Sequence, residues 1–220
     1  MANTNLPPAP DTRMGVVGGG TDKTRLIMLS GGIDSAYILW DALNNSKDDV
    51  FAHHISIRNL ENRWQQEREA VTKIIKYFDE KKIRPFMFSE SVWSFPYVEY
   101  FCWDIHVVAF VASQVAHNLK GKVTVYTGDY EGFRAEGEDD DKGRELRSKI
   151  ADDILASACQ DRENIEKKLV KPLIGIEKAE IVKKLPDDLL SLTWSCRTPK
   201  DGKPCEVCKT CKDLAEIKKK

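Results

Sequence analysis

Residues 30–35 read Ser-Gly-Gly-Ile-Asp-Ser and directly follow a short apolar run at 25–29. Gly31 and Gly32 let the backbone adopt positive φ and approach a ligand closely, because neither carries a Cβ. If a helix begins there, its first amides lack intrahelical partners and lie at the positive end of the helix dipole. The stretch therefore predicts a phosphate site formed by Ser30, Gly31, Gly32, Ile33, Asp34 and Ser35. The alternative is a turn in which Ser30 or Asp34 only caps the helix.

The carboxylate of Asp34 adds a constraint to this stretch. A negative charge beside a phosphate site would repel the ligand unless it serves a cation that bridges the phosphates. We therefore expect Asp34 to act together with Mg²⁺.

Four of the six cysteines lie near the C-terminus with the spacing C-x8-C-x2-C-x2-C: Cys196, Cys205, Cys208 and Cys211. Each C-x2-C step can bring two thiolates to one ion, and four sulfurs leave no position for water. The spacing predicts a closed, structural Zn²⁺ site, with an Fe–S cluster or redox disulfides as the alternatives. We expect the two isolated cysteines, Cys102 and Cys159, to serve packing.

These two groups must be positioned by elements that alternate between strand-like and helix-like patterns. Short apolar runs predict buried strands, and apolar residues spaced by three and four predict helices. We expect strands at 25–29, 50–57, 84–89, 122–128 and 168–174. We expect helices at 34–45, 61–80, 98–119, from the charged loop at 136–149 to about 161, and at 177–185. This order predicts an α/β fold with a doubly wound, five-stranded parallel sheet, in which ligands bind beyond the carboxyl ends of the strands.

Composition describes a globular chain of 220 residues with 41% hydrophobic and 31% charged residues and a net charge of −1. We expect a flexible leader at 1–24, an ATP-binding α/β domain at 25–190 and a small helical, zinc-binding segment at 191–220. No apolar run approaches the ~20 residues that a membrane span needs, and the N-terminus lacks a signal-peptide pattern. A cytoplasmic protein is expected, and no basic patch indicates nucleic-acid binding. His53 and His54, at the end of a strand, are expected to pack rather than to react.

The hexapeptide at 30–35, placed after the first strand, resembles the SGG-x-DS motif of the PP-loop ATP pyrophosphatases. The resemblance implies the adenine nucleotide alpha hydrolase-like fold of the HUP class. It also implies a reaction in which ATP adenylates a substrate oxygen and the loop holds the departing pyrophosphate. Gly128, after the fourth strand, is added to the nucleotide-binding residues on this basis.

Three further stretches resemble the 7-cyano-7-deazaguanine synthase family: the cysteine cluster preceded by LTWSC, KPLIGIEKAEIVKKL at 171–185, and ENRWQQE at 61–67. The resemblance implies that Lys178 and Arg63 face phosphates or the substrate carboxylate, so that Asp34, Lys178 and Arg63 are the expected catalytic residues. It also implies ATP-dependent activation of 7-carboxy-7-deazaguanine, followed by conversion with ammonia to the amide and then the nitrile. Members of that family commonly pair, so a homodimer is compatible with the sequence.

Two elements of that family are replaced here. Trp103 and Asp104 stand where Arg and Asn of a PGRN-like element would fall, and TGDYEGFRAEGEDDDKGRE at 127–145 replaces a second substrate element. Tyr130, Glu131 and Arg134 are candidates for an altered pocket. The acceptor is therefore open: a related deazapurine acid, an amine other than ammonia such as one on a protein, or a tRNA in a PP-loop tRNA-modifying enzyme. A zinc-binding protein with a degenerate ATP site is the non-enzymatic alternative.

Overall fold

A computed structural model of the chain describes residues 21–95, 103–128 and 141–217. Four parallel strands form one sheet in the order β3-β2-β1-β4. The strands are β1 (Lys23–Met28), β2 (Asp49–Arg58), β3 (Met87–Ser94) and β4 (Lys122–Tyr126). The predicted α/β class and parallel sheet are confirmed, whereas the predicted number of five strands is wrong.

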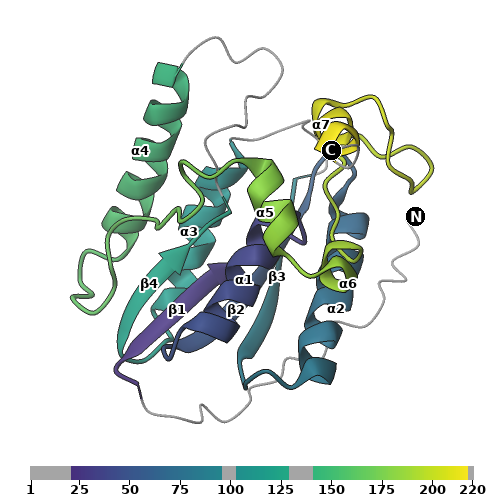
Figure 1. Cartoon of the computed structure of the whole chain (residues 1–220). Helices are drawn as coiled ribbons and strands as arrows, with labels where there is room; N and C mark the ends of the chain where they lie inside the picture. Colours follow the sequence, from purple (N-terminus) through teal and green to yellow (C-terminus); the bar gives the residue numbers. More distant parts are fainter. Residues whose placement is uncertain (1–20, 96–102, 129–140, 218–220) are drawn as a thin grey trace, which may run out of the picture.

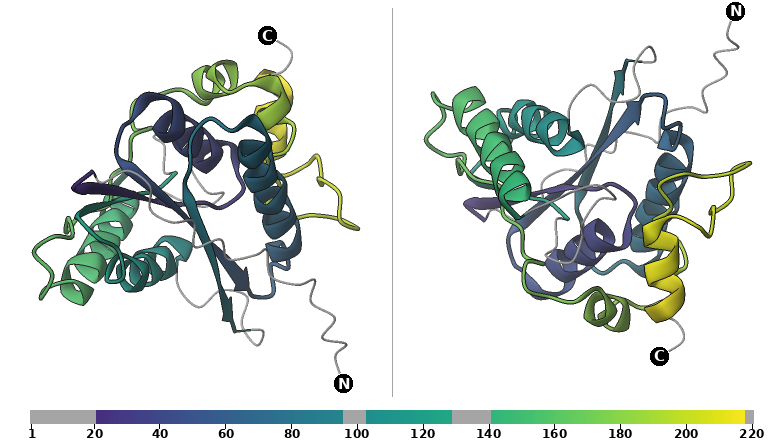
Figure 2. Two further views of the ribbon diagram at one scale, coloured as in Figure 1. Left: turned by 90° about the horizontal axis from the view of Figure 1, so that it is seen from below. Right: turned by 90° about the horizontal axis from the view of Figure 1, so that it is seen from above.

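Helices cover both faces of this sheet, as the two views in Figure 2 show. One face carries α1 (Ile33–Asn45), α2 (Trp64–Lys81), α5 (Lys178–Lys184) and the short α6 (Asp187–Leu190). The other carries α3 (Asp104–Ala116) and α4 (Asp141–Ala158). The last helix, α7 (Lys209–Ile217), lies beyond the carboxyl ends of the strands (Figure 1).

Alternation along β1 explains the two cores. Ile27 faces the core shared with α1 and α2, whereas Leu26 and Met28 face the core shared with α3 and α4. A strand that is buried on both faces has a nearly continuous apolar sequence, which is the pattern at 25–29. On α2, Val71 and Phe78 are buried, as the helical spacing predicts.

Residues 168–174 do not form the predicted fifth strand. Val170 makes one parallel bridge beside β4, donating its N–H to Val125 O at 2.8 Å and accepting from Thr127 N at 3.0 Å. Pro172 then turns the chain; it has no N–H with which to extend a ladder. Because Leu169 packs in the α3 and α4 core and Leu173 in the α1 core, the segment crosses the β4 edge and carries α5 to the opposite face.

β3 starts and ends later than the predicted 84–89. Pro85 cannot donate to a ladder, and the guanidinium of Arg84 donates to the carbonyls of Ser46 and Asp48. The paired residues are instead Met87–Ser94, whose polar side chains bond to β2: Ser89 and Ser91 contact His53. An edge strand rich in Ser and Glu does not show the apolar run used to predict the others.

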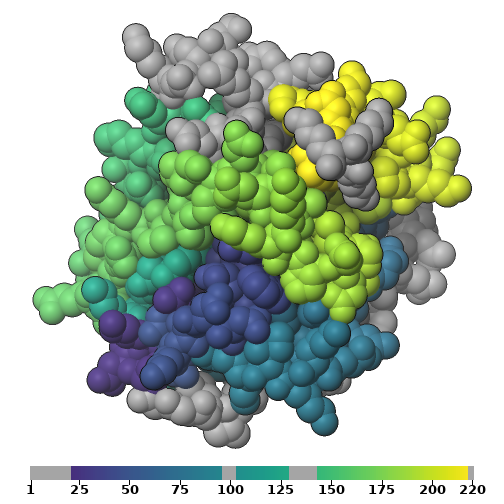
Figure 3. Space-filling model, in the orientation of Figure 1, coloured from purple at the N-terminus to yellow at the C-terminus, as the bar shows by residue number. Residues whose placement is uncertain are grey.

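The segment from Leu173 through α6 covers the α1 face of the sheet. Figure 3 shows the light green residues of α5 and α6 lying over the purple and blue of α1 and α2. Asp188 of α6 accepts from Tyr77 Oη at 3.2 Å and pairs with Lys81 at 2.9 Å, both on α2. None of the helices within the described residues is long and apolar enough to cross a membrane.

Several predicted features lie outside the described residues. These are the leader up to residue 20, the first part of the helix predicted at 98–119, Cys102, and the loop containing Tyr130, Glu131 and Arg134. Cys159 is fully buried in the core between α3 and α4, in agreement with its predicted packing role.

Candidate active site

A cavity of about 290 Å³ opens at the carboxyl ends of β1 and β2. The chain leaves β1 toward the α1 face and leaves β4 toward the opposite face, so this is the switch point of the doubly wound sheet. Segments far apart in the sequence meet here. Its lining includes Ser30, Gly32, Ile33, Asp34, Arg63, Glu67, Asp104, Gly128, Lys178 and Trp194 to Arg197.

The loop at 30–35 is held in shape by its two serines. Ser35 Oγ accepts from Ser30 N at 3.1 Å, contacts Ser30 Oγ at 3.0 Å and donates to Gly32 O at 3.2 Å. Gly32 stands at the N-cap of α1 with no side chain capping the helix. The alternative of a turn capped by Ser30 or Asp34 is therefore wrong. The hydroxyls brace the loop, and the residues at the start of α1 line the cavity without a side-chain cap.

Gly31 is required by its surroundings as well as by its φ of +83°. A Cβ at this position would lie 2.7 Å from Glu67 O, a backbone atom of α2, and 3.2 Å from Ala70 Cβ. The glycine thus allows the first turns of α2 to pack directly on the loop. Gly128 has a similar role from β4, because a Cβ there would lie 3.0 Å from Ser35 N and 3.1 Å from Asp34 Cβ.

Asp34 and Lys178 form an ion pair on the wall of the cavity. Lys178 Nζ, at the first position of α5, lies 2.5 Å from both carboxylate oxygens of Asp34. Burial lowers the pKa of Lys178, while the carboxylate of Asp34 opposes that shift. The ammonium compensates the negative charge of Asp34 beside the predicted phosphate site, in addition to the Mg²⁺ expected there.

Arg63 lies on the opposite wall among three carboxylates. Its guanidinium contacts Glu61 at 3.2 Å and Glu67 at 3.4 Å, and it forms a short hydrogen bond to Asp104 at the start of α3. Although burial alone would lower the pKa of Arg63, these carboxylates raise it above its usual value. Burial raises the pKa of Glu67 to about 7, and the charges of Asp104 and Glu61 act in the same direction.

Arg197 completes this charged group from the segment between α6 and α7. Burial lowers its pKa, as does the neighbouring Arg63, while Asp104 and the two glutamates oppose that shift. Two guanidinium groups and two carboxylates thus line this wall, and Glu61 contacts Arg63 beside them. Asp104, which takes the place of a polar residue in the family's pattern, is the partner that ties α3 to Arg63.

An apolar wall joins the two charged ones. Met28, Ile55, Ile57 and Val108 line the cavity on the α3 side of the sheet. His53 lies beside them and is 3% exposed, with Nδ1 2.6 Å from Ser89 Oγ and Nε2 2.9 Å from Ser91 Oγ. Burial lowers the pKa of His53 to about 4, so the ring is neutral at pH 7. Both histidines pack as predicted, and His53 also faces the cavity.

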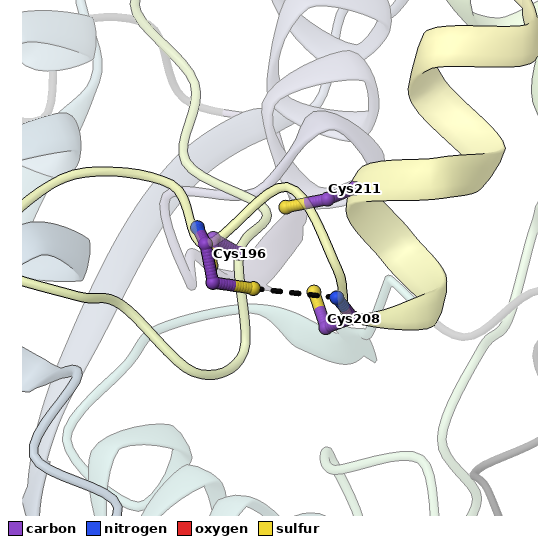
Figure 4. A group of neighbouring side chains, drawn as sticks. Cys196, Cys208 and Cys211 are labelled. Atoms are coloured by element: carbon purple, nitrogen blue, oxygen red, sulfur yellow. Dashed lines mark hydrogen bonds between the residues drawn. The ribbon is translucent and has the colours of Figure 1, made fainter.

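The four clustered cysteines come together as predicted. The Sγ atoms of Cys196, Cys205, Cys208 and Cys211 all lie within 4.8 Å of one another. Figure 4 shows the sulfurs of Cys196, Cys208 and Cys211 pointing toward a common centre, with Cys211 on α7 and Cys208 directly before it. Four thiolate donors at this separation fit a tetrahedral Zn²⁺ site and also fit an Fe–S cluster.

Trp194 connects this cluster to the glycine loop, a role that no sequence pattern indicated. Its backbone N–H donates to Gly31 O at 2.8 Å, and its indole N–H donates to Cys196 O at 2.9 Å. Cys196 itself lines the cavity. The cysteine-rich segment therefore forms part of the site wall.

Most of the predicted residues are brought together: Ser30, Gly32, Ile33, Asp34, Arg63, Gly128 and Lys178 all line one cavity. Gly31 and Ser35 stand behind the surface and shape it. The prediction missed the contributions of Asp104, Trp194 and Arg197. The only available signals were the motif departure at 103–104 and the position of Trp194 and Arg197 beside a metal-binding cysteine.

The C-terminal third of the chain matches a known family. The model of queuosine biosynthesis protein QueC matches residues 145–216, from within α4 to α7. This match confirms the resemblance to the 7-cyano-7-deazaguanine synthase family over that segment. The QueC-like part of the chain is therefore this segment, which contains Lys178 and the four clustered cysteines.

Comparison with curated protein sequences finds no match. Among solved structures, the chain is similar to the U34-tRNA thiolase NcsA from Methanococcus maripaludis with its [4Fe-4S] cluster. The identity is 15% and the TM-score 0.48, and the match covers 89% of this chain. The chain spans 63% of the length of that protein.

Proposed function

We propose that the chain is an ATP-dependent carbon–nitrogen ligase that adenylates the carboxylate of 7-carboxy-7-deazaguanine or a close analogue. Ammonia then displaces AMP to give the amide, and a second activation of the amide oxygen gives the nitrile. One observation carries the proposal: the SGG-x-DS loop and the QueC-like segment, which supplies Lys178 and residues 194–197, line the same cavity.

The loop end of the cavity suits the triphosphate. Amides at the start of α1 offer hydrogen bonds to phosphate oxygens, and Lys178 places a positive charge next to them. When the substrate carboxylate attacks the α-phosphate, negative charge grows on the departing pyrophosphate, and these groups would stabilise it there. Bound Mg²⁺, with Asp34 as its nearest candidate ligand, would supply further charge neutralisation.

The apolar wall suits a planar ring. Met28, Ile55 and Val108 offer a surface on which a purine or deazapurine could pack, and the charged wall lies beside it. An acid seated on this surface would direct its carboxylate toward the loop, where the α-phosphate of ATP would lie.

For the cysteine cluster we propose structural Zn²⁺ held by Cys196, Cys205, Cys208 and Cys211. The metal content of the purified protein tests this directly. One zinc per chain and no visible absorption band are expected, whereas iron with the broad band of an Fe–S cluster would contradict the proposal.

The ligase proposal is tested by mass spectrometry of 7-carboxy-7-deazaguanine incubated with the protein, MgATP and ammonium. Adenylate, amide or nitrile is expected, with release of pyrophosphate. Lys178→Met, which keeps the length of the side chain but removes its charge, should form none of them. If the wild-type protein binds ATP but forms no such product, the assignment of the acid is wrong.

A second candidate acceptor is an amine other than ammonia, such as one on a protein. It is favoured by the acidic side chains around Arg63, which include Asp104 where the family pattern has a neutral residue. The same incubation with short peptides in place of ammonium would reveal a covalent adduct. A PP-loop tRNA-modifying activity is also compatible with the loop, and it requires a salt-sensitive tRNA complex that a mobility-shift assay would detect.

A further inference from the structure

The charged wall of the cavity pairs its cations with carboxylates. Arg63 and Arg197 line the cavity together with Glu67 and Asp104, and Glu61 contacts Arg63 as well. Because carboxylates already surround the guanidinium of Arg63, the wall can offer a carboxylate to a protonated amine.

Glu67 belongs to the first turn of α2, whose backbone packs against the glycine loop. The backbone of α2 packs against Gly31 at Glu67, and the side chain lines the cavity with its Oε1 3.4 Å from Arg63 Nε. Glu61 also contacts Arg63, but it is not among the described residues that line the cavity. Asp104 lines the cavity and is engaged by the short hydrogen bond from Arg63.

We propose that Glu67 is the general base that takes a proton from the amine nucleophile before it attacks the acyl adenylate. This inference rests on the proposed ligase function and deepens it. Arg63 is then a positioning residue that orients the Glu67 carboxylate through the Nε contact.

In this step a bound ammonium ion gives one proton to the Glu67 carboxylate, which frees the nitrogen lone pair. The lone pair forms the C–N bond at the activated carbonyl, and the C–O bond to AMP breaks with its electron pair on the phosphate oxygen. The nitrogen loses its second proton to solvent as the amide forms, and Glu67 returns its proton to solvent. No oxidant or reductant is needed.

The electrostatics of the site suit this role. Burial raises the pKa of Glu67 to about 7. Among its charged neighbours, Arg63 and Arg197 act to lower this pKa, and Asp104 and Glu61 act to raise it. A base that titrates near neutral pH is both largely ionised and basic enough to accept a proton there.

The test separates the two half-reactions. Glu67→Gln keeps the shape of the side chain but cannot accept a proton, and Glu69→Gln is the matched control, because it removes an exposed carboxylate of the same helix that pairs with Lys73 outside the cavity. Adenylation is followed by pyrophosphate exchange into ATP with 7-carboxy-7-deazaguanine. Transfer is followed in a single turnover, with ammonium or with hydroxylamine, a strong nucleophile that is mostly uncharged at neutral pH.

We expect Glu67→Gln to slow transfer to ammonium by about 100-fold or more and to slow transfer to hydroxylamine by less than about fivefold. In the wild type at saturating ammonium, the transfer rate should rise with pH through about 7, and this rise should be absent in the variant. Glu69→Gln should stay within about threefold of the wild type in both transfers.

Equal losses with both nucleophiles would overturn the proposal, because they would show that Glu67 serves only to hold Arg63. A selective loss in Asp104→Asn, but not in Glu67→Gln, would overturn it by assigning the proton transfer to Asp104. If the glutamine variant fails to fold, the wild-type pH profiles decide: the absence of a rise near pH 7 contradicts the role of Glu67. Absence of pyrophosphate exchange in the wild type would instead contradict the underlying ligase proposal.

Discussion

The two charged walls of the cavity are built in different ways. The loop wall is built mainly from neighbouring residues: residues 30–35 brace one another through Ser30 and Ser35, and Lys178 is added to Asp34 from a distant part of the chain. The Arg63 wall is assembled from α2, α3 and the segment before α7, with Asp104 and Arg197 as the distant members.

This difference follows the chemistry each wall would perform. A phosphate chain can be held by backbone amides, which a short motif provides regardless of its neighbours. Selection of a nucleophile needs a balance of buried charges, and only side chains from several elements can provide it. The residues of the loop wall therefore match the SGG-x-DS motif, whereas the departure at Asp104 lies in the Arg63 wall.

The largest expected effect on stability and activity comes from removing the metal, because this should disturb both charged walls of the cavity. Chelation, or Cys208→Ser, should lower the free energy of unfolding by several kcal/mol, given that structural zinc contributes on the order of 10 kcal/mol in small peptides. Because Trp194 joins Cys196 to Gly31, pyrophosphate exchange should be lost as well. Urea unfolding and exchange assays with and without chelator measure these effects.

Cys159→Ala is the matched control for that experiment, because Cys159 is buried away from the cluster. It should keep its metal content and its pyrophosphate exchange. Retention of full exchange after the metal is removed would show that the two parts are independent.

The next largest effect should break the loop wall alone. Lys178→Met leaves the Asp34 carboxylate without its ammonium partner and removes charge from the phosphate end, so we expect pyrophosphate exchange to fall by about 10³-fold. Lys183→Met, an exposed lysine on the same helix, is the control and should exchange normally. If Lys178→Met changed the exchange rate only slightly, the phosphate site would have to lie elsewhere than at this ion pair.

A smaller effect should come from changing how the loop wall contacts α2. Gly31→Ala combines a positive φ with a backbone clash against Glu67 O, and we expect a loss of about 3 kcal/mol in the free energy of unfolding. Gly32→Ala places its Cβ 3.4 Å from Ser30 Oγ with no positive φ, so its stability should change by less than about 1 kcal/mol. Urea unfolding of both variants gives the comparison, and equal midpoints would contradict the packing described here.

The smallest effect concerns the wall between the two charged ones. The folded-state pKa of His53 is about 4, below the ordinary value of 6.5, so on acidification the unfolded chain takes up a proton before the folded one does. Because of His53, the free energy of unfolding should therefore fall by about 2 kcal/mol as the pH is lowered from 7 to 5. His53→Asn should remove that part of the pH dependence in urea unfolding, and an unchanged dependence would assign it to other groups.

Much of the site could be predicted because it lies in contiguous or regularly spaced residues. The hexapeptide at 30–35 and the four cysteines carry their chemistry in their spacing, and Lys178 was found through the pattern around it. The roles of Asp104, Trp194 and Arg197 could not be predicted in this way. Arg63 and Asp104 are 41 positions apart and meet only because α2 and α3 both begin at the carboxyl edge of the sheet.

The fold shows the same division. The strands with apolar runs were found, whereas β3 was displaced because its polar residues are satisfied by β2. The expected fifth strand makes only one bridge, since Pro172 ends its pairing.

The sequence by itself determined the glycine loop, the set of metal-binding cysteines and the alternation that produces a parallel sheet. Local spacing specifies each of these, because backbone geometry and thiolate pairing act over a few residues. Only the tertiary structure decided that Lys178 neutralises Asp34, that Trp194 joins the cysteine cluster to Gly31, and that Arg63 is surrounded by acids. Those contacts depend on where whole elements pack, and burial then sets the charge state of the groups that meet there.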